Sequence, residues 1–208
     1  MEGKSRSIPE VLESAIKLSG NIPLFGTRSA SRLVYGLLKL PKEQALQTLR
    51  AIEEAVLNLR RCAKCGLLTT DETCYICKDP LRSKFQMCVV EESQDAFSIE
   101  KLGKYNGLYH ILNGRIAPLE GISPSDLSID KLFERIENLN VKELILATNP
   151  NIEGEATANY IAKLAKRQFK HLKITRISHG LQFGSMIENS DPLSLEGSFA
   201  NRKTVEDT

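Results

Sequence analysis

Four cysteines in two closely spaced pairs constrain the fold of this chain more than any other feature. The pairs are Cys62-x-x-Cys65 and Cys74-x-x-Cys77, and a fifth cysteine, Cys88, lies alone in an apolar run. Two such pairs offer four thiolates at tetrahedral reach, which is the ligand set that a structural zinc ion prefers. Four cysteines also leave no open coordination position for catalysis. We therefore predict a small zinc knuckle that holds one Zn²⁺ per chain.

Disulfide bonds and redox catalysis are the alternatives for these cysteines. Disulfides need an oxidising compartment, whereas no stretch of this chain has the apolar length of a membrane helix or the pattern of an export signal. A redox site would need a single dithiol, so a second pair has no obvious use there. With 41% hydrophobic and 26% charged residues among 208, the composition is that of a globular protein. We expect a cytoplasmic protein with no membrane association.

Hydrophobic periodicity divides the chain into segments of different type. Before the cysteines, apolar residues recur at spacings of three and four, which predicts helices up to Gly20, over Ser29 to Leu40 and over Lys42 to Arg61. After them, the pattern alternates between short apolar strands (MCVVEE, LYHIL, ELILAT, LKITRIS) and helical stretches (QDAFSIEKLG, SIDKLFERIENLN, GEATANYIAKLAKRQF). Such alternation favours a mainly parallel sheet covered by helices.

The predicted fold class is therefore α+β with several modules. We expect a helical hairpin module over residues 1–59, the zinc knuckle over 60–80, an α/β domain over 81–180 and a C-terminal tail over 181–208. Charge is unevenly distributed along these segments. Residues 1–90 hold 14 Lys and Arg against 9 Asp and Glu, although the whole chain has a formal charge of only +2. A basic first part and an acidic second part indicate different partners for the two, with evenly solvated faces as the alternative.

Acidic residues follow two of the predicted strands, where α/β sheets carry their functional groups. Glu91 ends the first strand, and the loop after ELILAT contains Asn149, Asn151, Glu153 and Glu155. A glutamate after one strand and Asp-x-Asp-x-x-Gly-Glu after another resembles the Toprim domain of topoisomerases and primases. In that family the glutamate and the two aspartates carry magnesium-dependent phosphoryl transfer.

This sequence has Asn149 and Asn151 where the Toprim pattern has aspartates. Mg²⁺ prefers anionic oxygen ligands, and an amide contributes no charge to offset the loss of hydration. We therefore expect a Toprim-like fold without Toprim chemistry and no catalytic residues. The retained acids Glu91, Glu153 and Glu155 would then form a partner-binding surface, although a solvated helix N-terminus explains the latter two equally well.

The order of helical module, four-cysteine knuckle and Toprim-like domain resembles the RecR family of bacterial recombination mediators. The phrases CVVEESQD, NGRIAPLEGISP, ILATNPNIEGEATANYIA and ITRISHG carry this resemblance over essentially the whole chain. It implies a helix-hairpin-helix, a homo-oligomeric ring that clamps DNA, and RecO-like and RecF-like partners that help to load recombinase at single-stranded gaps.

A helix-hairpin-helix uses a glycine-rich turn followed by basic residues to bind phosphates. Residues Pro23 to Ala30 resemble that pattern, with Gly26 retained and Leu24 in place of the other glycine. Arg28 and Arg32, one helical turn apart, are the predicted DNA contacts, unless they are simply two solvated arginines. We expect sequence-independent binding, because no recognition helix is evident.

The predicted function is a non-enzymatic, DNA-binding mediator of recombinational repair that acts as an oligomeric clamp and scaffold. Two alternatives belong to other classes. One is a magnesium-dependent Toprim phosphoryl transferase that uses Glu91, Glu153 and Glu155. The other is a zinc-stabilised interaction protein that does not bind DNA.

Overall fold

The computed structural model describes residues 8–23, 25–178 and 180–202. Leu24, whose effect on the hairpin the sequence leaves open, lies outside the described residues. The chain divides into two compact units, residues 1–58 and residues 59–208. Among the described residues, no helix is long and apolar enough to cross a bilayer.

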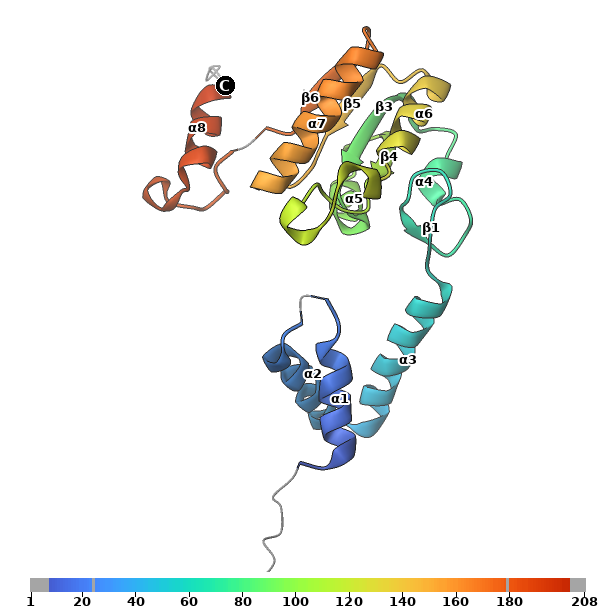
Figure 1. Ribbon diagram of the computed structural model, residues 1–208, viewed down its shortest axis with the longest axis vertical. Coiled ribbons are helices and arrows are strands. Elements are labelled where there is room, and N and C mark those ends of the chain that lie inside the picture. The colour runs from blue at the N-terminus through green and yellow to red at the C-terminus, as the bar shows by residue number, and fades with distance from the viewer. Residues whose placement is uncertain (1–7, 24, 179, 203–208) are drawn as a thin grey trace, which may run out of the picture. The chain divides into compact units, whose positions relative to one another are not determined.

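The first unit consists of helices, as the hydrophobic periodicity predicts (Figure 1). They are α1 (Glu10–Gly20), α2 (Thr27–Lys39) and α3 (Lys42–Asn58). Helices α1 and α2 pack closely, since a Cβ atom built on Gly20 would lie 3.9 Å from the Cβ of Ala30. Ala30 is the single buried residue in the described part of this unit. The helices therefore leave most of their apolar side chains uncovered within one chain.

The prediction that the third helix reaches Arg61 is wrong, because α3 ends at Asn58. Strand β1 (Arg60–Arg61) follows and pairs antiparallel with β2 (Leu68–Thr69). This two-stranded ribbon brings the first cysteine pair back toward the second. In the second pair, Cys74 is the N-cap of the single-turn helix α4 (Tyr75–Lys78) and Cys77 lies within it. The helix thus ends earlier than its apolar pattern predicts, because the chain must turn to bring the four cysteines together.

The second unit contains a four-stranded sheet in the order β4-β3-β5-β6. Its strands are β3 (Ser83–Val90), β4 (Gly107–Ile111), β5 (Glu143–Leu146) and β6 (Lys173–Arg176). All three strand pairs are parallel, which confirms the predicted parallel sheet. Strand β3 begins before the apolar run predicted at Met87, and its pairing with β4 shifts register between Ser83 and Met87.

Helices follow the strands in the predicted alternation. They are α5 (Ser93–Glu100), α6 (Ile129–Leu139), α7 (Ile152–Gln168) and, after the sheet, α8 (Pro192–Ala200), with short 3-10 turns at η1 (Pro118–Glu120), η2 (Pro124–Asp126) and η3 (Ile187–Asn189). Asp191 caps α8 by accepting a hydrogen bond from the Ser194 N–H at 2.9 Å. The C-terminal tail predicted over 181–208 thus contains the short helix α8.

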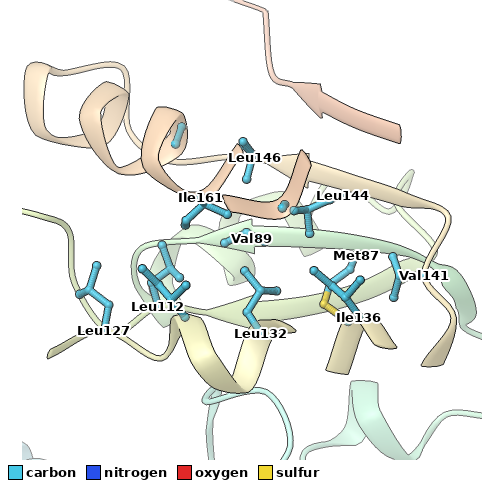
Figure 2. Close-up of a cluster of buried hydrophobic side chains, with 13 residues drawn as sticks. Met87, Val89, Leu112, Leu127, Leu132, Ile136, Val141, Leu144, Leu146 and Ile161 are labelled. Carbon is cyan, nitrogen blue, oxygen red and sulfur yellow. The ribbon is translucent and has the colours of Figure 1, made fainter. Parts of the chain in front are cut away.

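Successive residues of β3 point to opposite faces of the sheet and into two different cores. Met87 and Val89 pack with the apolar sides of α6 and α7, including Leu132, Ile136 and Ile161 (Figure 2). On the other face, Cys88 and Val90 pack with α5 and with the buried part of the cysteine knuckle. The knuckle is thus built into the second unit as part of its core. The fifth cysteine, Cys88, is 3% exposed and serves as a small apolar residue.

Candidate zinc centre, acidic loop and basic helix

The four predicted ligand cysteines converge. The Sγ atoms of Cys62, Cys65, Cys74 and Cys77 all lie within 4.8 Å of one another, and the four cysteines form no disulfide. Four sulfurs on a tetrahedron around zinc, with Zn–S bonds of about 2.3 Å, stand about 3.8 Å apart. Cys65 and Cys74, with sulfurs 3.5 Å apart, are close to that spacing. The donor set and its dimensions therefore fit one zinc ion.

Protonation within the cluster shows why a cation belongs there. The hydrogen bond between Cys65 and Cys74 lowers the pKa of Cys74 to about 2 and raises the pKa of Cys65 above its ordinary range. The two sulfurs thus favour sharing one proton, because ionising both would place two negative charges side by side. A divalent zinc ion removes this restriction, because its charge allows all four sulfurs to ionise.

Backbone groups complete the knuckle. The Cys74 N–H donates to the Cys62 Sγ at 3.3 Å, and the Cys77 N–H donates to the Cys74 Sγ at 3.5 Å. Gly66 has φ +83°, and a Cβ atom there would lie 3.1 Å from the Ile111 carbonyl oxygen. A glycine is therefore required for the turn and for its close approach to β4.

The acidic loop is held together by hydrogen bonds between Glu91 and Asn149. Glu91 is only 3% exposed, and its Oε1 and Oε2 accept from the backbone N–H and the side-chain Nδ2 of Asn149, both at 2.8 Å. Asn149 thus donates to the carboxylate where the Toprim pattern would place a second carboxylate. In the described part of the chain, Glu91, Glu153 and Glu155 do not converge on one point as the cysteines do.

Other residues of this loop have structural partners as well. Asn151 caps α7, since its Oδ1 accepts from the Gly154 N–H at 2.7 Å. Gly154 lies so close to Asn149 that a Cβ atom would come within 2.1 Å of its carbonyl oxygen. Glu155 accepts from the Arg176 guanidinium at 2.6 Å. Both Glu153 and Glu155 are half-buried at the start of α7.

Arg28 and Arg32 lie in the first two turns of α2 and are both exposed. Gly26 is the N-cap of this helix, no side chain caps it, and its first turn contains no acidic residue. The first N–H groups of such a helix are available to an anion, and the positive end of the helix dipole favours one. The arrangement can therefore bind a phosphate.

Sequence reasoning missed a buried polar network around β4. His110 is 1% exposed and lies between Arg135 of α6 and Ser128. Arg176, which holds Glu155, was also missed. An arginine at a helical or strand position has no local pattern that would indicate its distant partner. A histidine inside the apolar run LYHIL was the available signal, because a buried histidine requires hydrogen-bond partners.

Comparison with known proteins agrees with this geometry. Residues 86–178 match the family model of the Toprim domain, and residues 59–79 match that of the four-cysteine zinc finger domain of RecR. The chain is 56% identical over 195 residues to the recombination protein RecR of Aquifex aeolicus strain VF5, a match that covers 94% of this chain and 92% of that protein. The chain belongs to the RecR family. As a RecR family member it binds one zinc ion through its four-cysteine knuckle, and its general role lies in DNA recombination and repair.

Proposed function

We propose that this RecR family member is a non-enzymatic, DNA-binding mediator of recombinational repair. It acts as an oligomeric clamp and scaffold, with RecO-like and RecF-like proteins, to help load recombinase at single-stranded gaps in the cytoplasm. The observation that carries DNA binding is the pair of exposed arginines, Arg28 and Arg32, at the uncapped start of α2. We expect these roles to be distributed over the four predicted modules, which are residues 1–59, 60–80, 81–180 and 181–208.

The phosphate contact combines two favourable terms. No side-chain cap competes with an anion for the N–H groups after Gly26, and Arg28 and Arg32 add two formal charges one turn apart. Neither arginine has an ion-pair partner among the described residues. Such contacts are made to the DNA backbone and therefore do not discriminate between sequences.

Self-association follows from what the first unit leaves exposed. Helix α3 has no buried residue in its 17 positions. Leu46, Leu49, Ile52 and Val56 recur along it at helical spacing and are between 43% and 77% exposed. An apolar stripe of this kind is unfavourable in water and indicates a protein–protein contact. We propose that a second copy of this chain covers it, so that several arginine pairs act on one DNA molecule.

The acidic loop is the proposed surface for a basic partner protein. Glu153 and Glu155 are accessible at the start of α7, whereas Glu91 is buried. Glu91 therefore contributes to partner binding by fixing the loop through Asn149. Arg176 leaves a net negative charge on the pair of accessible glutamates.

The same hydrogen bonds argue against phosphoryl transfer. Both oxygens of Glu91 are already engaged by N–H donors, and Asn149 and Asn151 add no charge to offset magnesium dehydration. Magnesium-dependent cleavage or nucleotide transfer by the purified protein, lost in Glu91→Gln, would establish the enzyme alternative and contradict this part of the proposal.

The test of DNA binding is fluorescence anisotropy with labelled gapped DNA over a salt titration. We expect affinity to fall steeply with salt, and Arg28→Ala/Arg32→Ala to weaken binding and to lower the log–log salt slope by about 2 per chain. Lys39→Ala/Lys42→Ala is the matched control and should bind nearly as the parent does, because it removes the same charge from exposed positions at the end of α2 and the start of α3.

Equal loss in both double variants would show that net charge alone drives binding and would exclude the hairpin site. Absence of binding by the parent at low salt would contradict the proposal and favour the zinc-stabilised interaction protein.

A further inference from the structure

A cavity of about 410 Å³ lies beside the zinc knuckle, between it and helix α6. Cys77 reaches its wall. The charged side chains around it are mostly basic: Lys64, Arg82, Lys84, Lys131 and Arg135, against Asp79 and Glu134. Basic side chains thus outnumber acidic ones around the cavity, and like charges placed close together need a nearby negative charge to balance them.

The zinc centre supplies that negative charge. Zn²⁺ with four thiolates carries a formal charge of −2, and three of the four cysteines are at most 3% exposed. A buried charge is costly unless opposite charges or hydrogen-bond donors face it. An anionic ligand in the cavity would be repelled by the same centre, so the basic side chains are better matched to the thiolates than to a bound anion.

Most of these basic side chains either bind other protein groups or are exposed and not held in one position. The Arg82 guanidinium donates to Glu100 and to the Tyr105 and Gly107 carbonyls, and its Nε lies 3.7 Å from the Asp79 carboxylate. The three lysines are exposed. An exposed lysine retains its hydration and its rotamer freedom, and contributes little to a buried charge.

Arg135 differs because it is half-buried and fixed. Its Nη1 donates to the Tyr109 carbonyl oxygen at 2.8 Å and lies 3.0 Å from the His110 Nδ1. Within the described residues, no carboxylate lies within ion-pair distance of it. It lines the same cavity as Cys77, so its fixed positive charge lies on the side of the zinc centre that this cysteine presents.

His110 orients this arginine. A guanidinium can only donate, so the His110 Nδ1 must accept, and the proton lies on Nε2, which donates to the Ser128 carbonyl oxygen at 2.9 Å. Burial, together with the charge of Arg135, lowers the pKa of His110 to about 3, so the ring remains a neutral acceptor near neutral pH.

The knuckle and Arg135 also bind the same strand edge. Strand β4 is the outer strand of the sheet, so its outward backbone groups need partners. The Ile111 N–H donates to the Cys65 carbonyl oxygen at 2.8 Å, and the Tyr109 carbonyl, two residues before it, accepts from Arg135. The zinc ligands and Arg135 are therefore attached side by side to one rigid element.

We propose that Arg135 is a positioning residue of the zinc centre, a fixed cation from α6 that stabilises the four-thiolate site and joins it to the Toprim-like domain. The partners that orient a metal site commonly affect metal affinity by about 10- to 100-fold. This inference does not depend on DNA binding, and its failure would leave the proposed function intact.

The first test is the rate of zinc transfer from the folded protein to a chromophoric chelator. We expect Arg135→Met to release zinc at least about tenfold faster than the parent, and Arg135→Lys to be intermediate because it keeps the charge but loses the planar fork. Lys131→Met is the matched control, since it removes a cation from the same helix and cavity wall. It should release zinc within about twofold of the parent rate. Equal acceleration in Lys131→Met and Arg135→Met would overturn the special role of Arg135, as would no acceleration in either.

A second measurement separates this role from simple loosening of the β4 edge. Thermal midpoints are compared for the parent and Arg135→Met, each with zinc and after chelation. Coupling between two sites is reciprocal, so Arg135→Met should lower the midpoint more in the zinc-loaded protein than in the zinc-free protein. An equal decrease in both states would show that Arg135 stabilises the strand edge alone and would refute the proposal.

Discussion

At the scale of single residues, the distinctive feature of this chain is an asparagine that donates to a buried glutamate. Asn149 satisfies both oxygens of Glu91 with N–H donors and so replaces the cation that such a carboxylate would otherwise need. The sequence reveals that a charge is missing from the Toprim pattern. It does not reveal that the replacement amide turns toward Glu91, because that contact joins residues far apart in the chain.

Asn149→Asp tests this contact directly. The new carboxylate would face Glu91 at the position of a 2.8 Å hydrogen bond, so we expect a loss of about 1–3 kcal/mol in unfolding free energy at neutral pH. Like-charge repulsion raises a carboxyl pKa, so the loss should shrink as the pH falls through that raised value, and Mg²⁺ should restore part of the stability. Urea unfolding with and without Mg²⁺ measures both effects.

Asn151→Asp is the control, because an aspartate also caps a helix N-terminus well and should change stability by less than about 0.5 kcal/mol. An Asn149→Asp variant as stable as the parent would show that the hydrogen bond to Glu91 is unimportant.

His110 gives a second prediction at this scale. Its pKa is about 3 in the folded chain and about 6.5 when unfolded, so below about pH 6.5 the unfolded state binds a proton that the native ring does not. The free energy of unfolding should therefore decrease as the pH is lowered from about 6.5 toward about 3. The decrease should reach ~3 kcal/mol at about pH 4. The variant His110→Gln lacks this proton uptake, so its free energy of unfolding should decrease by ~3 kcal/mol less than that of the parent over the same pH range. Urea unfolding at several pH values measures the difference. Bound zinc is measured in both proteins at each pH, and parallel curves over the range in which both retain zinc would contradict the assignment.

At the scale of elements, the zinc knuckle closes the edge of β4. The spacing of the cysteines predicts the knuckle and its metal, and the alternating pattern predicts the parallel sheet. Neither predicts that the Cys65 carbonyl accepts from Ile111, since this bond depends on how the two elements pack. The end of α3 was misjudged for a related reason, because Arg60 and Arg61 continue a helical pattern but pair with the strand at Leu68–Thr69.

Removal of zinc should consequently expose the amides at the outer edge of β4 to hydrogen exchange, while the centre of the sheet stays protected. We expect the Ile111 amide to exchange at least about tenfold faster in zinc-free protein or in Cys65→Ser, while amides of β5 retain their protection. Hydrogen exchange read by mass spectrometry measures this. Cys88→Ser should keep one zinc per chain, as the control for loss of a buried thiol. Uniform loss of protection would show that the metal stabilises the whole unit.

At the scale of the whole molecule, the two units differ in how they are stabilised. The unit over residues 59–208 has two buried cores and a metal, whereas the described part of the unit over residues 1–58 buries Ala30 alone. Periodicity in the sequence predicts the helices of that unit, apart from the end of α3. It cannot show whether their apolar faces pack within one chain or against another, because both arrangements have the same pattern.

Leu49→Glu/Ile52→Glu tests the second arrangement. Two charges on the exposed stripe of α3 should shift the protein from oligomers to monomers, because a charge buried in an interface lacks a partner. Sedimentation velocity over a range of concentrations measures the masses. Leu102→Glu/Leu119→Glu places the same charge on side chains that are 70% and 103% exposed, and should leave the assembly unchanged. Oligomers that survive in the α3 variant would place the contact elsewhere.

That Ala30 is the single buried residue among those described in the helical unit has a consequence for how stability depends on protein concentration. If neighbouring copies supply the missing core, the free energy that holds these helices together grows with the logarithm of protein concentration. Dilution would then unfold helices α1, α2 and α3 first, while the zinc-binding unit stays folded. The cellular abundance of this protein would thereby set the fraction of molecules in which the helical unit is folded.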